Sequence, residues 1–196
     1  MHLDLATTSM LAGMVLNETP ALHTLSPEEA RLVFTEINRS MPPGPDSVSS
    51  EDCQIPVDGG SIRARVLRSS AQAKSVMVYY HGGGWVIGNI DDYDAVGRHL
   101  AETCSAVVVM VDYRKAPEHA FPVPVNDCYA ALEWVDAQRS QLGIDGLPLV
   151  VAGDSAGGNL SAVMAIRSRD ENGPEIALQA LIYPVTDGRM GADSFT

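Results

Sequence analysis

Ser155 stands in a sequence pattern that can turn a hydroxyl group into a nucleophile. It lies at the centre of a Gly-x-Ser-x-Gly turn that runs from Gly153 to Gly157. An apolar run over 147–152 predicts a short buried strand before this turn, and the pattern over 156–169 predicts a helix after it. A serine on a sharp turn between a strand and a helix is the arrangement that a nucleophile elbow requires.

The glycines at 153 and 157 have a physical reason. The backbone of the serine must adopt strained angles, and a Cβ atom at either glycine would collide with the strand or the helix. The turn also places the hydroxyl group at a helix N-terminus, whose dipole favours developing negative charge. The pattern alone equally fits an ordinary turn that merely joins a strand to a helix.

A second motif supports the chemical interpretation. Residues 81–85 read His-Gly-Gly-Gly-Trp and follow a run at 75–80 that is rich in β-branched and aromatic residues, which predicts a strand. Glycines after a strand leave backbone N–H groups uncovered, and each such donor stabilises an oxyanion by a factor of ~10²–10³ in rate. A flexible glycine loop is the plainer alternative, but it does not explain the serine turn downstream. Together the two motifs predict acyl-transfer chemistry.

Two further stretches complete a pattern. Residues 112–122 read Asp-Tyr-Arg-Lys-Ala-Pro-Glu-His-Ala-Phe-Pro, and Tyr183-Pro184 ends the last predicted strand. In order and spacing, these stretches and the two motifs resemble the hormone-sensitive-lipase-like branch of the α/β-hydrolases. The resemblance covers about residues 50–187 well and the N-terminal part loosely. It implies that Ser155 is the nucleophile and that an oxyanion hole is formed by the N–H groups of Gly83, Gly84 and Ala156.

The resemblance also implies a substrate pocket, for which Trp85, Asp154 and Tyr183 are candidates. We expect Asp154 to orient the loop beside the nucleophile rather than to serve as the triad acid, because its backbone position next to Ser155 points it elsewhere. The expected chemistry needs no cofactor. The sequence contains no Cys-x-x-Cys pair and no cluster of His and Cys ligands, so no metal site is expected.

The histidines depart from the family pattern. The family's triad runs Ser, then Asp or Glu, then His along the chain. All five histidines here, at 2, 23, 81, 99 and 119, precede Ser155. By resemblance, His81 and His119 have structural roles. We therefore expect the general base and the acid to lie outside residues 1–196, in a remaining C-terminal part of the same protein.

The predicted strand at 177–183 also indicates that part of the protein lies outside residues 1–196. A strand so apolar would normally be covered on both faces and paired on both sides. At the edge of a sheet it would tend to associate with other chains. We therefore expect that residues 1–196 are not a whole folding unit and that further strands belong beside this one.

Length and charge restrict the classes of partner. A chain of 196 residues can form one domain with a real core. Its net charge of −12 disfavours nucleic acid and anionic membranes as partners.

The sequence also bears on the cellular location, because residues 1–20 make a poor signal peptide. The cysteines are odd in number, which favours free thiols in the reducing cytoplasm; they are Cys53, Cys104 and Cys128.

Alternating strands and helices predict an α/β fold with a mostly parallel central sheet and a site at the carboxyl ends of its strands. Residues 46–187 form the expected hydrolase core, incomplete at its C-terminal end. Residues 1–45 are expected to be helical, with Ser26 as N-cap of a helix. By resemblance this segment is part of a cap over the active site, and a simple packing helix is an equal alternative. Residues 188–196 are expected to begin a loop or a second cap segment.

Three local expectations concern the core. Strands at 52–57 and 61–67 should form a hairpin around the turn at 58–60. The Arg63 and Arg65 side chains should lie on a solvated face. Arg114 should act as a structural brace with Asp112 or Glu118. Further helices are expected at 91–103, with Asp91 or Asp92 at its N-terminus, and at 126–138, and a central strand at 106–111.

The leading hypothesis is a serine hydrolase that cleaves carboxylic esters through an acyl-enzyme. By resemblance, the substrate is a small-molecule ester with a short to medium acyl chain. A non-catalytic small-ligand-binding protein of the same fold is an alternative, because no histidine follows Ser155. An amidase or peptidase on the same elbow, and an inactive truncated product, also remain open. A homodimer is compatible with each of these.

Overall fold

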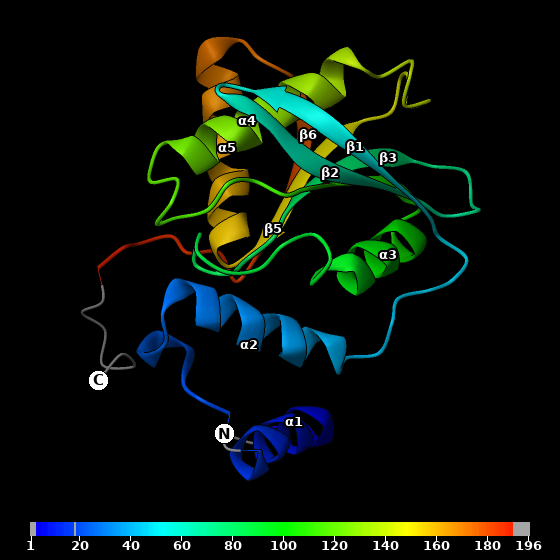
Figure 1. Ribbon diagram of the computed structural model, residues 1–196. Helices are drawn as coiled ribbons and strands as arrows, with labels where there is room; N and C mark the ends of the chain where they lie inside the picture. The colour runs from blue at the N-terminus through cyan, green and yellow to red at the C-terminus, as the bar shows by residue number, and fades with distance from the viewer. Residues whose placement is uncertain (1–2, 18, 190–196) are drawn as a thin grey trace.

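A computed structural model describes residues 3–17 and 19–189, and these residues are organised around a six-stranded sheet (Figure 1). The strand order is β1-β2-β4-β3-β5-β6. The strands are β1 (Ser49–Val57), β2 (Gly60–Arg68), β3 (Ser75–Tyr80), β4 (Ala106–Val111), β5 (Leu149–Asp154) and β6 (Ile176–Ile182). The helices are α1 (Leu5–Leu16), the 3₁₀ turn η1 (Leu22–Thr24), α2 (Pro27–Arg39), α3 (Asp94–Thr103), α4 (Val123–Ala137) and α5 (Ala156–Glu171).

The pairing of the strands brings the two motif loops together. β1 and β2 form the predicted antiparallel hairpin, and β2 is antiparallel to β4. β4, β3, β5 and β6 are parallel to one another. Tyr80, the last residue of β3, is paired with Gly153 near the end of β5. The glycine loop and the serine turn therefore leave the sheet side by side at its carboxyl edge, as the fold class predicts.

Helices cover both faces of the sheet, α4 and α5 on one and α3 on the other (Figure 1). Every residue of β4 and β5 is buried. Strands enclosed in this way read as continuous apolar runs, which is why the sequence pattern located them. The predicted mostly parallel α/β-hydrolase fold is confirmed.

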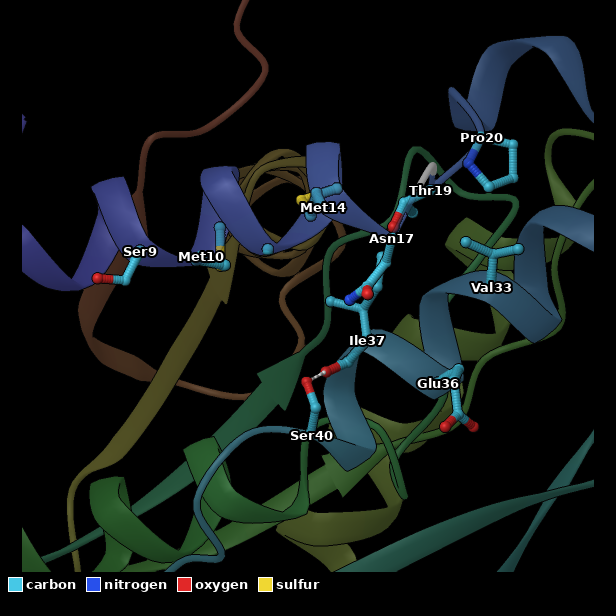
Figure 2. A pocket seen from close by; sticks show the side chains of 11 residues that line it. Ser9, Met10, Met14, Asn17, Thr19, Pro20, Val33, Glu36, Ile37 and Ser40 are labelled. Atoms are coloured by element: carbon cyan, nitrogen blue, oxygen red, sulfur yellow. Dashed lines mark hydrogen bonds between the residues drawn. The ribbon is translucent and has the colours of Figure 1, made fainter.

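The N-terminal helices begin where the sequence predicts. The Ser26 hydroxyl accepts a hydrogen bond from the Glu29 backbone N–H at 3.3 Å, and the Glu29 carboxylate accepts one from the Ser26 N–H at 2.9 Å. This is a complete capping box. α1 lies outside α2, away from the sheet (Figure 1). A cavity of about 490 Å³ separates the two helices, with Met10 and Met14 on one wall and Ile37 on the other (Figure 2).

Element ends differ from the prediction by up to three residues. β1 begins at 49 rather than 52, α3 at 94 rather than 91, and α4 at 123 rather than 126. The expectation that Asp91 or Asp92 caps α3 is wrong, because Tyr93 holds the N-cap position and no side chain caps the helix. Residues 190–196, on which most of the predicted loop or second cap segment falls, lie outside the described residues.

The expectation of a solvated face for Arg63 and Arg65 is also wrong. Only 14% of the Arg65 side chain is exposed, and it bonds to Asp52 at 2.7 Å and to Asp94 at 2.9 Å. Both arginines also contact Asp91. Asp52 lies on the neighbouring strand β1, Asp91 precedes α3, and Asp94 is the first residue of α3. Asp52 is directly opposite Arg65 in the hairpin, whereas Asp91 and Asp94 lie almost 30 positions away, where local alternation in the hairpin sequence could not reveal them.

Arg114 is a brace, as predicted, but its partner is different. Its Nε and Nη2 donate to Asp127 on α4 at 2.8 and 2.7 Å, and its backbone N–H donates to the same carboxylate at 3.0 Å. Asp127 is 1% exposed, so the pair satisfies a buried charge. The sequence suggested neighbours in the same loop, whereas the fold brings in an acid from the following helix.

β6 is an edge strand with apolar side chains in contact with solvent. Leu178 is 59% exposed, and Leu181 and Ile182 are each 38% exposed. The expectation that further strands cover β6 remains a prediction. Among the described residues, no helix is long and apolar enough to cross a lipid bilayer.

Asp127→Ala is expected to lower the free energy of unfolding by about 3 kcal/mol, because it leaves the partly buried Arg114 charge without its partner. Asp136→Ala is the matched control. It removes an exposed acid that pairs with Arg139 within the same region, and it should cost about 0.5 kcal/mol or less. Denaturant titration of both variants checks this, and equal losses would contradict the assignment of Asp127 as a buried anchor.

Candidate active site

The Ser155 backbone has the strained conformation of a nucleophile elbow, with φ 51° and ψ −116°. A Cβ atom at Gly157 would lie 1.8 Å from the carbonyl oxygen of Tyr80, and one at Gly153 would lie 2.4 Å from the carbonyl carbon of Gly157. Neither distance can be accommodated, so both glycines are required for α5 to start this close to β3 and β5. The glycine argument made from the sequence is therefore confirmed.

The end of β6 holds the strained serine in place. The Ser155 N–H donates to the carbonyl of Ile182 at 2.9 Å, and the Ser155 carbonyl accepts from the N–H of Val185 at 3.1 Å. The Asn159 side chain donates to the carbonyl of Val185 at 2.9 Å. Strained residues persist only where their surroundings fix them, and this segment does so on both sides of the serine.

The glycine loop has three successive residues with positive φ, of which only Trp85 is strained, because glycine adopts such angles freely. Gly83, Gly84 and Trp85 have successive φ values of 113°, 60° and 61°. The N–H groups of Val86 and Ile87 both donate to the carbonyl of Gly83, at 3.0 and 2.9 Å, which closes the turn. Within 3–17 and 19–189, the N–H groups of Gly83, Gly84 and Ala156 have no acceptor. These three donors are free to bind an oxyanion.

Asp154 joins the glycine loop to the elbow. Its Oδ1 accepts from the N–H of Gly82 at 2.9 Å and from the Tyr79 hydroxyl at 2.7 Å, and its Oδ2 accepts from the Tyr93 hydroxyl at 3.1 Å. Burial raises the pKa of both tyrosines well above the ordinary value, so they remain donors at alkaline pH. The Asp154 carboxylate is 6% exposed and is occupied by these three donors. The contact with Gly82 is the loop-orienting interaction that the sequence led us to expect.

His81 is buried beneath the glycine loop. Its ring stacks on Tyr113 with centroids 4.5 Å apart, and its Nδ1 lies 2.7 Å from the carbonyl oxygen of Gly82. Because a carbonyl can only accept, Nδ1 carries the proton and Nε2 does not. Nε2 has no hydrogen-bond partner among the described residues. Burial lowers the pKa of His81 to about 4, so the ring is neutral at pH 7.

The other described histidines lie at the surface, unlike His81. His23, His99 and His119 are exposed, and His2 lies outside the described residues. No group of three or more His, Cys, Asp or Glu side chains able to hold a metal ion occurs in the part of the chain that the structure describes.

An apolar cavity of about 520 Å³ opens beside the glycine loop and the elbow helix. Trp85 lines it, as do Gly84 of the glycine loop and Asn159, one helical turn after Ser155. Asp154 and Tyr183, the other pocket candidates, do not line it, and Tyr183 is 73% exposed at the end of β6. The remaining lining residues are Ala116, Phe121, Pro124, Val125 and Val163.

Sequence reasoning missed most of this cavity wall. Phe121 belongs to the loop before α4, Val125 to α4, and Val163 to α5, so only the fold brings them together. Val163 carried a signal as part of the apolar stripe of its helix, but that signal is the same for a core position and a pocket wall.

The fold, the strained serine elbow and the neighbouring free N–H donors together define an α/β-hydrolase. A family model described as alpha/beta hydrolase fold matches residues 77–195. The chain belongs to this family, in its hormone-sensitive-lipase-like branch, as the resemblance implied.

Curated relatives and solved structures agree with this membership. The chain is 51% identical over 121 residues to carboxylesterase NlhH of Mycobacterium tuberculosis (strain ATCC 25618 / H37Rv), over 62% of this chain and 38% of that protein. It is 35% identical to ethyl acetate hydrolase of Pseudomonas putida, over 95% of this chain and 59% of that protein. A crystal structure of a thermostable esterase from Pseudomonas putida ECU1011 superposes with a TM-score of 0.90 at 33% identity, over 98% of this chain and 61% of the other. The chain thus spans less than two thirds of the length of each.

The buried, neutral state of His81 predicts a pH effect on stability. In the unfolded chain the histidine has its ordinary pKa of 6.5 and binds a proton on acidification, whereas the folded ring resists protonation until about pH 4. The contribution of His81 to the free energy of unfolding should therefore fall by about 3 kcal/mol between pH 7 and pH 4, at about 1.4 kcal/mol for each pH unit over which the two states differ.

Denaturant titration at several pH values measures this slope. His81→Phe keeps a planar ring on Tyr113 but cannot titrate, so the difference between the wild type and this variant isolates the histidine. Identical pH dependence in the two proteins would contradict a buried, neutral His81.

Proposed function

We propose that this chain carries the nucleophile and the oxyanion hole of a serine hydrolase that cleaves carboxylic esters. The observation that carries the proposal is the position of Ser155, on a strained elbow next to the free N–H groups of Gly83, Gly84 and Ala156. Relatives named as carboxylesterase and ethyl acetate hydrolase support it.

The proposed reaction has two stages. A general base removes the proton of the Ser155 hydroxyl, and Oγ attacks the ester carbonyl carbon. The carbonyl oxygen becomes an oxyanion held by the three N–H groups, the C–O bond to the alcohol breaks, and the alcohol leaves with the proton. In the second stage, water attacks the carbonyl carbon of the acyl-enzyme, the bond to Ser155 Oγ breaks, and the carboxylic acid is released while Ser155 regains its proton. The base and its acid remain predicted outside residues 1–196.

The apolar cavity beside Gly84 is the proposed site for the hydrocarbon part of the ester. Its volume of about 520 Å³ is in the range of small-molecule pockets, and Trp85, Phe121 and Val163 give it an apolar wall. A space of this size supports the proposal of a short to medium acyl chain. Asp154 acts beside it as a positioning group for the glycine loop, not as a wall residue.

The division of the chain is likewise proposed. Residues 1–45, with α1 and α2, form an N-terminal cap segment, residues 46–187 form the hydrolase core, and residues 188–196 begin the next segment.

The three free cysteines, of which Cys128 is buried, support the proposal of a reducing, cytoplasmic location. A homodimer stays a prediction from the sequence.

In the longer protein that includes the part predicted to carry the base, Ser155→Ala is expected to keep the fold and to lower kcat for p-nitrophenyl butyrate by about 10⁴-fold or more, because the nucleophile is removed. Ser161→Ala is the matched control, since this buried serine lies on the same helix and its hydroxyl only donates to the carbonyl of Gly157. It should keep kcat within about threefold. Turnover by Ser155→Ala would overturn the assignment, and ligand binding without turnover in the wild type would favour the binding-protein alternative.

Val163→Phe is expected to shorten the acyl chains that are accepted, because the larger side chain fills part of the cavity. The ratio of kcat/KM for p-nitrophenyl octanoate to that for the acetate should fall by about tenfold or more. Ile166→Phe, one helical turn away in α5 at a site that is 52% exposed, should leave the ratio unchanged. A shift of the same size in both variants would argue against the cavity as the acyl site.

A further inference from the structure

Arg31 is the side chain of α2 that reaches into the catalytic loops. Its Nε donates to the carbonyl of Val86 at 2.8 Å, and its Nη2 donates to the carbonyl of Ala116 at 2.9 Å. Its Nη1 and Nη2 also bind both carboxylate oxygens of Glu118, at 2.9 and 2.7 Å. One guanidinium group thus joins a helix of the N-terminal segment to two loops more than 50 positions away.

Both loops belong to the proposed site. Val86 directly follows the strained Trp85, and Ala116 lines the apolar cavity. The two loops also contact each other, because the N–H of Ala116 donates to the carbonyl of Trp85 at 2.9 Å. Arg31 therefore holds the point at which the oxyanion loop meets the cavity wall.

The oxyanion loop needs such support. Trp85 has φ 61°, which is unfavourable for a residue with a Cβ atom and is kept only when several contacts fix it. Asp154 fixes the beginning of the loop through the N–H of Gly82, from within the core. Arg31 fixes its end at Val86, from outside the core. The first contact comes with the fold of the sheet, whereas the second exists only while α2 is docked.

α2 has few other attachments to the core. Ala30 is its only buried residue in the described structure, the ring of Phe34 lies 6.2 Å from the ring of Tyr93, and the Thr35 side chain forms a hydrogen bond with Asp92. The cavity between α1 and α2 leaves the opposite side of α2 open (Figure 2). α2 lies across the end of the molecule at which β5 passes into α5, which is the end that carries Ser155 (Figure 1). Arg31 is therefore a major part of what keeps α2 there.

We propose that Arg31 is a positioning residue: it couples the docking of α2 to the shape of the oxyanion loop and to the cavity wall at Ala116. The inference rests on the proposed ester hydrolysis and adds to it a role for the N-terminal segment. An arginine is suited to this role because its planar fork binds a carboxylate in two places while a further N–H reaches a carbonyl. A lysine has no such fork.

The ion pair is suited to persist over a wide pH range. The hydrogen bonds from Arg31 lower the pKa of Glu118 to about 2, so the carboxylate stays charged in any mildly acidic solution. The contribution of the pair is present above the ordinary pKa of the carboxyl group, 4.5, and is lost only as the pH falls toward 2.

The test compares Arg31→Ala, Arg31→Lys and Glu118→Gln with Arg39→Ala in the intact protein. Arg39 is the matched control, because it lies on the same helix and pairs only with Glu36 at an exposed position. Arg31→Ala and Arg31→Lys should lower kcat for p-nitrophenyl butyrate by about tenfold and change KM by less than about threefold, since misplaced oxyanion donors affect the transition state. Glu118→Gln keeps the contacts to Val86 and Ala116 and should lose less than about threefold in kcat, and Arg39→Ala should lose nothing.

Hydrogen–deuterium exchange of the peptide covering 82–88 provides a readout that does not need turnover. Arg31→Ala should increase exchange in this peptide and in α2, and Arg39→Ala should not. Unchanged exchange at 82–88 together with a wild-type kcat would overturn the role of Arg31. Absence of ester turnover in the wild type would instead refute the proposed function, and the exchange comparison would still decide whether Arg31 holds the loop. If Arg31→Ala fails to fold, Arg31→Lys carries the same comparison.

Discussion

The close approach of α5 to the end of β3 is the constraint on which the rest of the site depends. Gly157 lies so near the carbonyl of Tyr80 that no side chain fits between them. This approach forces the Ser155 backbone into its strained conformation and brings the start of α5, with the free N–H of Ala156, next to the glycine loop. Parallel pairing of β3 with β5 makes the approach possible, because both strands end at the same edge of the sheet. The proposed nucleophile and the proposed oxyanion donors thus both depend on this packing contact.

Polar contacts then fix the two ends of the glycine loop, which this packing does not hold. Asp154 ties the beginning of the glycine loop to the strand that carries the elbow, and Tyr79 and Tyr93 satisfy the rest of its carboxylate. Arg31 binds the end of the same loop from α2. A buried carboxylate whose oxygens all accept hydrogen bonds holds its surroundings firmly, whereas the partly exposed ion pair of Arg31 and Glu118 contributes less and depends on the docking of α2. The contact from Asp154 is therefore a buried hydrogen bond within the core, whereas the contact from Arg31 comes from a helix packed outside it.

Much of the fold and the centre of the site follow from local sequence patterns, and the exceptions share a physical cause. β4 and β5 were predictable because strands enclosed on both faces must be apolar throughout. The glycines around Ser155 were predictable because their requirement is steric and local. The partner of Arg114, the burial of Arg65 and the cavity wall at Val163 were not, because each depends on residues that only the tertiary fold brings together. Single arginines and acids in a sequence carry no information about which of many opposite charges they will meet.

The most direct test of the central claim uses the longer protein that includes the part predicted to carry the base. It is the mass of this protein after exposure to a fluorophosphonate, a reagent that phosphonylates activated serines with loss of fluoride. The account predicts one adduct for each chain, which peptide mapping places on Ser155. It also predicts that prior incubation with a small ester slows the labelling. No adduct, or an adduct on another residue such as Ser161, would contradict the claim that Ser155 is the activated nucleophile of this site.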